Sequence, residues 1–160
     1  MKTSHNFFSN LAFNLAENNV GKTNKNPSVG CVIVKNNSVI SSGVTSINGR
    51  PHAEYNALSK NLNFKDAYMY VTLEPCTHYG ITPPCTNLIK KKRVKKVYYC
   101  FEDPDIRTYK KAKIVLNNRI KKIKKIDDRN KDFYKSYFLN KKYKLPFIDA
   151  KIAISKDFST

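Results

Sequence analysis

Two stretches of this 160-residue chain decide its fold: Pro51-His52-Ala53-Glu54 and Thr72-Leu73-Glu74-Pro75-Cys76-Thr77-His78-Tyr79-Gly80-Ile81-Thr82-Pro83-Pro84-Cys85. Together they offer one imidazole, from His52, and two thiols, from Cys76 and Cys85. A histidine nitrogen and two thiolates suit zinc, and three protein ligands leave its fourth tetrahedral position open. An open position distinguishes a catalytic zinc site from a structural one. The stretches therefore predict a catalytic zinc centre with His52, Cys76 and Cys85 as ligands.

Glu54 has the position of a proton carrier in this centre. It lies two residues after His52, at the start of an expected helix, so its carboxylate reaches the same pocket without binding the metal. There it accepts a proton from the attacking water and passes it to a leaving amine. Helix N-termini expected at His52 and Pro83 place partial positive charge beside the thiolates and favour their ionisation. We therefore predict Glu54 as the catalytic residue.

Strands and helices are expected to alternate along the chain. Short apolar runs predict strands, and Asn36-Asn37 predicts a turn that joins the first two strands as a hairpin. The predicted strands cover residues 29–34, 39–44, 67–73, 97–101, 119–126 and 145–154. The predicted helices cover residues 1–19, 52–58, 108–116 and 127–140, and one more starts at Thr82-Pro83 and ends in the basic run 90–96. This order is typical of an α/β sandwich with a partly parallel sheet.

Basic residues dominate the charge of the chain. Lys and Arg number 30 against 12 Asp and Glu, a formal net charge of +18. Such an excess is typical of proteins with polyanionic partners. However, 25 of the basic residues are Lys and only five are Arg, whereas Arg best fits phosphates and guanine edges. We therefore interpret the charge as compositional, and we expect it to attract an anionic small molecule rather than nucleic acid.

The long metal stretch, and the segments 26–34 and 51–58, resemble the deaminase domain of the bifunctional pyrimidine deaminase/reductase family of riboflavin biosynthesis, the RibD family. Zinc-dependent nucleobase deaminases share His-x-Glu followed by Pro-Cys and a second Cys, usually as Cys-x-x-Cys. Here eight residues separate Cys76 from Cys85. The resemblance implies an α/β fold of the cytidine deaminase-like type, a three-layer α/β/α sandwich with a mixed central sheet. It also implies a zinc-dependent deaminase domain over residues 1–144.

The reaction that the resemblance implies is hydrolytic deamination of 2,5-diamino-6-(5-phosphoribosylamino)pyrimidin-4(3H)-one to 5-amino-6-(5-phosphoribosylamino)uracil. The family's zinc ligands and proton donor fall on the residues already singled out. Asn26 and His78 resemble its substrate-binding residues. An Asn amide both donates to and accepts from a pyrimidinone edge, and a His donates to a phosphoribosyl group. The resemblance therefore implies Asn26 and His78 as substrate contacts.

Two positions depart from the family pattern. Thr45 stands where the family has a His, and Ile81 stands where it has a Lys or Arg. Arg50, two residues before the zinc histidine, and the neighbouring lysines are the candidates to replace the missing cation. At the other end, residues 145–160 resemble the first strand of the family's NADPH-dependent reductase domain, so we expect either a truncated half of the fusion or a stand-alone deaminase that keeps a vestige of it. A separate or missing reductase is the expected partner.

Other activities remain open on these residues. One is deamination of another base, such as cytidine, deoxycytidylate or a tRNA adenosine, and another is a catalytically silent, basic RNA-binding protein with the deaminase fold. No apolar run approaches the roughly 20 residues that span a bilayer, and the first ten residues lack a signal-peptide pattern. We therefore expect a cytoplasmic enzyme without a membrane partner, and by resemblance a homo-oligomer. Cys31 and Cys100 lie in apolar strands and are expected to be buried core residues.

Overall fold

One mixed sheet forms the centre of the protein. The computed structural model describes residues 5–153, 155 and 156. The sheet has five strands in the order β2-β1-β3-β4-β5. They are β1 (Gly30–Lys35), β2 (Ser38–Val44), β3 (Tyr68–Leu73), β4 (Lys96–Phe101) and β5 (Ile120–Lys122). β1 runs antiparallel to β2 and β3, whereas β3, β4 and β5 are parallel. The mixed sheet confirms the predicted fold class.

Two asparagines make the hairpin between β1 and β2. Asn36 and Asn37 have φ angles of 50° and 62°. A two-residue turn with both φ angles positive matches the right-handed twist of the flanking strands, and Asn adopts this conformation more readily than most residues. The predicted hairpin is therefore confirmed at its turn.

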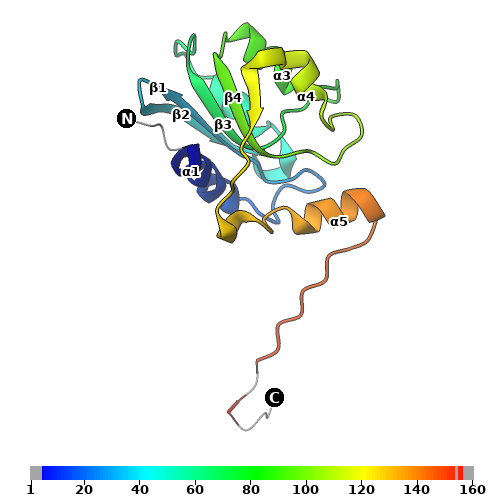
Figure 1. The fold of residues 1–160 in the computed structure, drawn as a ribbon. Helices are drawn as coiled ribbons and strands as arrows, with labels where there is room; N and C mark the ends of the chain where they lie inside the picture. The colour runs from blue at the N-terminus through cyan, green and yellow to red at the C-terminus, as the bar shows by residue number, and fades with distance from the viewer. Residues whose placement is uncertain (1–4, 154, 157–160) are drawn as a thin grey trace.

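Five α-helices lie on the two faces of the sheet: α1 (His5–Glu17), α2 (Ala53–Leu58), α3 (Cys85–Lys91), α4 (Lys111–Leu116) and α5 (Lys135–Tyr143). α1 and α5 lie on the side opposite α3 (Figure 1), and α2, α3 and α4 pack in sequence on one another. The arrangement is the predicted three-layer sandwich. Within the part of the chain that the structure describes, no helix is long and apolar enough to cross a membrane.

Two glycines allow helices on both faces to approach the hairpin. A Cβ on Gly30 would lie 1.8 Å from the carbonyl oxygen of Ala12 in α1, and a Cβ on Gly43 would lie 2.4 Å from that of Ala53 in α2. Gly43 pairs with Cys31, the neighbour of Gly30. Since successive residues of a strand point to opposite faces, the two glycines open opposite faces of the same hairpin.

A buried tyrosine hydroxyl joins the α5 layer to the sheet. The Tyr134 hydroxyl donates to the carbonyl oxygen of Ser28 at 2.9 Å and lies 2.6 Å from the hydroxyl of Thr72. The Thr72 hydroxyl in turn accepts the backbone N–H of Gly30 at 3.1 Å. Tyr134 is 2% exposed, so every member of this chain of hydrogen bonds replaces water that burial removes. It holds α5 over the end of β3 that leads to the metal loop.

Several predicted boundaries are wrong. The third helix begins at Cys85 rather than at Thr82-Pro83, since Pro84 is its N-cap. The region 127–140 is split into a 3-10 turn (Asp128–Asn130) and α5, because the Asp127 carboxylate caps the short turn. Strand β5 has three residues, because the chain turns away from the sheet after Ile123 donates its N–H to Tyr99. The helix predicted at 108–116 starts at Lys111.

The strand predicted at 145–154 is also wrong over the residues that the structure describes. Residues 145–153 form no strand and run away from the body after α5 (Figure 1). A strand needs backbone partners for its N–H and C=O groups, and none of the described sheet residues pairs with this segment. Residue 154 and residues 157–160 of the expected reductase-like segment lie outside the described part.

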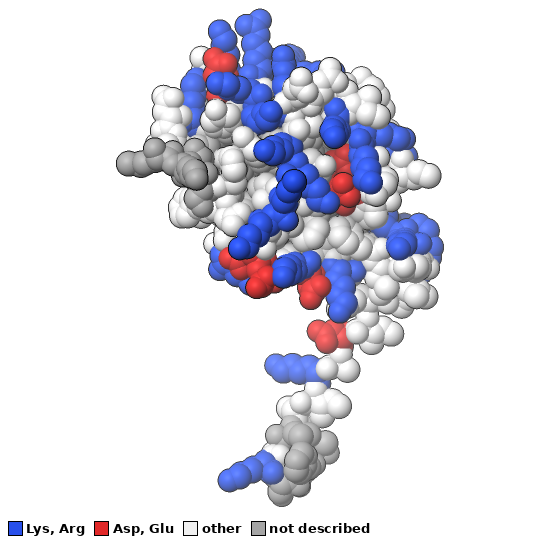
Figure 2. Space-filling view, viewed as in Figure 1, with Lys and Arg blue, Asp and Glu red and all other residues white. Residues whose placement is uncertain are grey.

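Lysines and arginines cover much of the face shown in Figure 2, and acidic side chains are fewer there. The edge strand β5 contributes to this charge, because Lys121 and Lys122 are exposed. Charged side chains on a short edge strand oppose pairing with a second sheet. Part of the basic excess therefore has a structural use at this edge.

Substituting Gly30→Ala tests the close approach of α1. The added methyl group overlaps a backbone carbonyl that cannot rotate away, so we expect the free energy of unfolding to fall by about 1–3 kcal/mol or more. Gly80→Ala is the control, since its nearest neighbour is a flexible arginine nitrogen at 3.6 Å. Urea unfolding followed by circular dichroism measures both. Equal stability of the two variants would show that the helix moves aside without cost.

Candidate active site

Three potential metal ligands from separate segments meet at one point. His52 Nδ1 lies 3.5 Å from Cys85 Sγ and 3.8 Å from Cys76 Sγ, and the three ligand atoms lie within 4.8 Å of one another. Among the residues that the structure describes, this is the group of three or more His, Cys, Asp or Glu side chains placed to hold a metal. The structure therefore brings together all three predicted ligands.

Two helix starts and one loop position these ligands. His52 is the N-cap of α2, in an extended conformation (φ −70°, ψ 159°), and its side chain makes no capping bond. Cys85 is the first residue of α3. Cys76 lies in the loop after β3 and caps α3 from outside, since its sulfur accepts the Cys85 N–H at 3.2 Å and its carbonyl accepts the Thr86 N–H at 3.3 Å. Neither N-cap residue makes a capping bond with its side chain, because His52 belongs to the metal group and Pro84 has no hydrogen-bonding side chain.

The donor set and its spacing fit zinc. A tetrahedral zinc ion with bonds of about 2.3 Å to sulfur and about 2.0–2.1 Å to nitrogen holds a nitrogen and a sulfur ligand roughly 3.6 Å apart. The two nitrogen–sulfur distances, 3.5 and 3.8 Å, agree with this spacing. Hydrogen bonds from the side chain of Cys85 and from His52 lower the pKa of the Cys76 thiol to about 4. Cys76 is therefore held as a thiolate, the form that binds metal.

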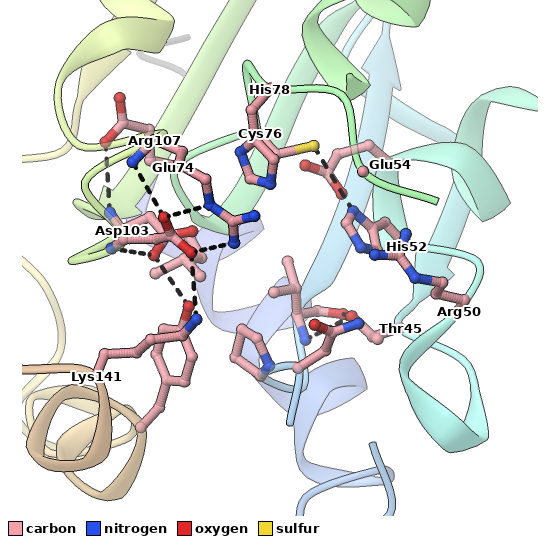
Figure 3. Close-up of a pocket in the computed structure, with 17 residues that line it drawn as sticks. Thr45, Arg50, His52, Glu54, Glu74, Cys76, His78, Asp103, Arg107 and Lys141 are labelled. Atoms are coloured by element: carbon pink, nitrogen blue, oxygen red, sulfur yellow. Dashed lines mark hydrogen bonds and ion pairs between the residues drawn. The ribbon is translucent and has the colours of Figure 1, made fainter. Parts of the chain in front are cut away.

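Glu54 is buried beside the ligands. It lies in the first turn of α2, and its residue is 4% exposed. Burial, and then the negative charge of Cys76, raise the pKa of its carboxyl group to about 7. A carboxyl group with a pKa near neutrality both accepts and releases protons efficiently at neutral pH. Its side chain points toward His52 and Cys76 (Figure 3), as the sequence predicts.

The cavity next to this group contains the predicted substrate residues. Asn26, Arg50 and His78 all line it. The Asn26 amide donates to the Gly49 carbonyl at 2.9 Å, and His78 Nδ1 lies 3.1 Å from the hydroxyl of Thr108. Arg50 donates from Nη1 to Thr82 at 2.8 Å. Each side chain is thus oriented by a second residue.

Of the two positions that depart from the family pattern, one faces the site and one does not. Thr45 lines the cavity and is 2% exposed. Its hydroxyl accepts the backbone N–H of Val29 at 3.0 Å. Ile81 is 86% exposed and is absent from the cavity lining among the described residues. A ligand in the cavity therefore meets the small side chain of Thr45 at the position where the family has a His.

The comparisons with known proteins agree with this geometry. Residues 2–101 match the family described as "Cytidine and deoxycytidylate deaminase zinc-binding region". The chain belongs to this family. The matched range contains all three metal ligands and Glu54, so zinc is the metal of the group.

Relatives of this deaminase family resemble the chain along nearly all its length. The "Riboflavin biosynthesis protein RibD" of Haemophilus influenzae is 36% identical over 156 residues, which are 96% of this chain and 42% of that protein. The structure of Acinetobacter baumannii RibD, form 2, matches with a TM-score of 0.82 at 35% identity, over 96% of this chain and 44% of that one. The chain therefore spans less than half the length of these relatives.

A third match is the diaminohydroxyphosphoribosylaminopyrimidine deaminase/5-amino-6-(5-phosphoribosylamino)uracil reductase of Thermotoga maritima. It has a TM-score of 0.78 and 33% identity, over 89% of this chain and 42% of that one. The resemblance of the metal stretch to the RibD family is thus confirmed over most of the fold, and not only at the motif.

The site residues predicted from the sequence include none on the wall of the cavity opposite His52 (Figure 3). That wall is formed by charged and hydroxyl side chains from the loop after β4 and from α5: Asp103, Asp105, Arg107, Tyr137 and Lys141. The Asp103-Pro104-Asp105 segment does give a signal, since two carboxylates follow a buried strand directly. Nothing local indicates Lys141, whose partner Asp105 lies 36 residues earlier.

Glu74 holds this wall to the metal loop. Its carboxylate accepts three backbone N–H groups, from Ala112 at 3.1 Å, from Lys110 at 3.0 Å and from Asp103 at 3.4 Å. Glu74 is 3% exposed, and burial raises its pKa while these hydrogen bonds oppose the rise. Since Glu74 lies two residues before Cys76, one side chain couples the position of a metal ligand to the loop after β4.

Replacing Glu74 by Gln tests this coupling. The amide group has one acceptor oxygen, so at least one buried N–H loses its partner, and we expect the free energy of unfolding to fall by about 1–3 kcal/mol. Glu102→Gln is the matched control, because Glu102 is partly exposed and pairs with Lys122 at the surface. Thermal unfolding of the zinc-loaded proteins compares the two. If both variants melt with the wild type, the three hydrogen bonds contribute nothing to stability.

Proposed function

We propose that this protein is a zinc-dependent deaminase of riboflavin biosynthesis. Its substrate is the phosphoribosylaminopyrimidine predicted above, and its products are the corresponding uracil and ammonia. The observation that carries the proposal is the meeting of the His52, Cys76 and Cys85 ligand atoms at one point, next to a cavity that the buried Glu54 lines. The chain is also similar to RibD proteins over nearly its whole length. The name of the Thermotoga relative supplies the substrate class.

The catalytic work divides between the metal and Glu54. When bound by His52, Cys76 and Cys85, zinc supplies a water of lowered pKa as nucleophile at neutral pH. Glu54 accepts a proton from the attacking water and delivers it to the amino group that leaves as ammonia. Because the Glu54 carboxyl group is buried with a pKa near 7, neither its charged nor its neutral form is strongly disfavoured. It therefore carries a proton in both directions.

Asn26 and His78 are proposed to hold the pyrimidine. Since the amide nitrogen of Asn26 is used by Gly49, its oxygen is the atom assigned to accept from the ring. The Thr108 hydroxyl fixes Nδ1 of His78, so Nε2 is the atom assigned to the ligand. Arg50 is proposed as a further substrate contact, because it lines the cavity beside the metal group.

Four further expectations accompany this proposal. The four cysteines form no disulfide, which supports a reducing compartment such as the cytoplasm. Among the residues that the structure describes, the helices and strands end with α5 at Tyr143, which supports residues 1–144 as the deaminase domain. The homo-oligomer and the separate reductase partner stay predictions.

Zinc content tests the ligand assignment. We expect about one zinc per chain in the purified protein, and we expect Cys76→Ser to lose most of it because only two ligands remain. The matched control is Cys100→Ser, since Cys100 is buried in β4 and is not part of the metal group. Elemental analysis by mass spectrometry measures the ratio of zinc to protein. Full zinc in Cys76→Ser would exclude Cys76 as a ligand.

Removing the carboxylate tests the proton carrier. Glu54→Gln keeps the volume of the side chain and the metal ligands, so zinc content should be unchanged. Ammonia release should fall by at least about 100-fold, the lower end of the range for losing a general acid–base. Release is followed by a coupled ammonia assay. Activity within threefold of the wild type would assign the proton transfer to another group.

The substrate is tested on the wild-type protein. We expect ammonia from the diaminopyrimidine ribose phosphate and little from cytidine, deoxycytidylate or a tRNA adenosine. Ammonia from one of these three alone would place the protein with a different deaminase activity. Absence of any deamination, together with tight RNA binding that weakens steeply with salt, would identify it as an RNA-binding protein.

A further inference from the structure

Two cations on the wall opposite His52 share one carboxylate. Arg107 binds Asp105 with two hydrogen bonds, Nε to Oδ1 at 2.9 Å and Nη2 to Oδ2 at 2.6 Å. Lys141 of α5 donates to the same Oδ2 at 3.2 Å. The Asp105 side chain is 10% exposed, whereas those of Arg107 and Lys141 are 57% and 27% exposed. The two cations are therefore more exposed than the carboxylate that they share.

The guanidinium of Arg107 retains hydrogen-bonding capacity. It has five N–H donors in a planar fork, and the bonds to Asp105 use two of them. Nη1 takes no part in these two bonds. The side chain extends into the cavity rather than out of it (Figure 3). An oxyanion in the cavity would thus meet a charged donor that Asp105 already holds in place.

The loop that carries Arg107 is held in place on both sides. The Thr77 hydroxyl donates to the Arg107 carbonyl at 3.0 Å, and the Arg107 N–H donates to Asp105 Oδ1 at 3.0 Å. On the α5 side, the Tyr137 hydroxyl donates to Asp103 Oδ1 at 3.0 Å. A positioned cation loses less conformational entropy on binding an anion than a free surface lysine does.

These cations lie at the other end of the cavity from the metal group. Arg50 lies beside His52, whereas Lys141 lies on the opposite wall (Figure 3). Arg107 and Lys141 both pair with Asp105 on that wall. The cavity thus has one cation beside the metal group and two that are held on the opposite wall, of which Arg107 reaches toward the middle of the cavity (Figure 3).

The proposed substrate, like the cavity, has different chemistry at its two ends. The inference drawn from this likeness rests on the proposed function. Its reacting amino group and its phosphate are separated by the pyrimidine ring and the ribose. With the amino-bearing carbon at the metal, the phosphate must lie far from His52. We infer that Arg107 and Lys141 bind the substrate phosphate, and that Asp105 positions both cations. Arg and Lys side chains both pair with phosphate by charge-assisted hydrogen bonds.

Kinetics with and without the phosphate test this inference. For Arg107→Gln and Lys141→Gln, we expect kcat/KM for the phosphorylated substrate to fall by about 10- to 100-fold each, the usual effect of losing a hydrogen bond to a charged group. The dephosphorylated riboside should change by less than threefold. Arg107→Lys should recover part of the loss. Lys142→Gln and Arg119→Gln are the controls, because both residues are exposed and neither lines the cavity.

Each result decides the assignment. Selective loss for the phosphorylated substrate supports it. An equal loss for both substrates, in variants that keep zinc and a native circular dichroism spectrum, assigns the two cations to the architecture of the cavity instead. A selective loss in Arg50→Gln alone places the phosphate beside the metal and overturns the inference.

Binding of ribose 5-phosphate separates this inference from the proposed function. It is measured by NMR titration of the zinc-loaded protein and needs no turnover. Weaker binding in Arg107→Gln and Lys141→Gln, in a wild type that deaminates nothing, would leave the phosphate site standing and remove the proposed reaction. Deamination by the wild type, with ribose 5-phosphate bound equally by all variants, would do the reverse.

Discussion

The convergence of His52, Cys76 and Cys85 is the constraint on which the rest of the site depends. The three ligand atoms lie within 4.8 Å of one another, although they come from the start of α2, the loop after β3 and the start of α3. Two helix starts must therefore meet at the end of one strand. The close approach of α2 to Gly43 places the first of them against the sheet, and the capping of α3 by Cys76 places the second. The eight-residue spacer between Cys76 and Cys85 lets the chain return from the end of β3 to the start of α3.

Features whose causes lie within a few residues could be predicted from the sequence. The turn at Asn36-Asn37 depends on the conformational preference of two side chains, and the metal group depends on residue types that few other sites combine. The start of α3 was predicted wrongly because Thr82 is an ordinary capping residue, whereas the actual cap is the sulfur and carbonyl of Cys76. A cap supplied by a remote residue leaves no pattern in the local sequence.

The second wall of the cavity could not be predicted for the same reason. Lys141 reaches the cavity only because Tyr134, in the turn before α5, is anchored to Ser28 and Thr72 by buried hydrogen bonds. No spacing rule connects residues more than 100 positions apart. The net charge of +18 was equally uninformative about this wall, since its two cations are matched in number by Asp103 and Asp105. The excess lies outside the cavity, where it raises the local concentration of anions without choosing among them.

The two sides of the cavity come from different segments of the chain. The metal ligands and Glu54 all lie within residues 52–85, inside the range shared with the wider family. The opposite wall is built from residues 103–141, beyond that range. Mutations in residues 103–141 can change the part of the cavity that contacts the far end of a ligand, without changing the metal ligands or Glu54. The chemical reaction of the enzyme and its choice of substrate can therefore evolve at different rates.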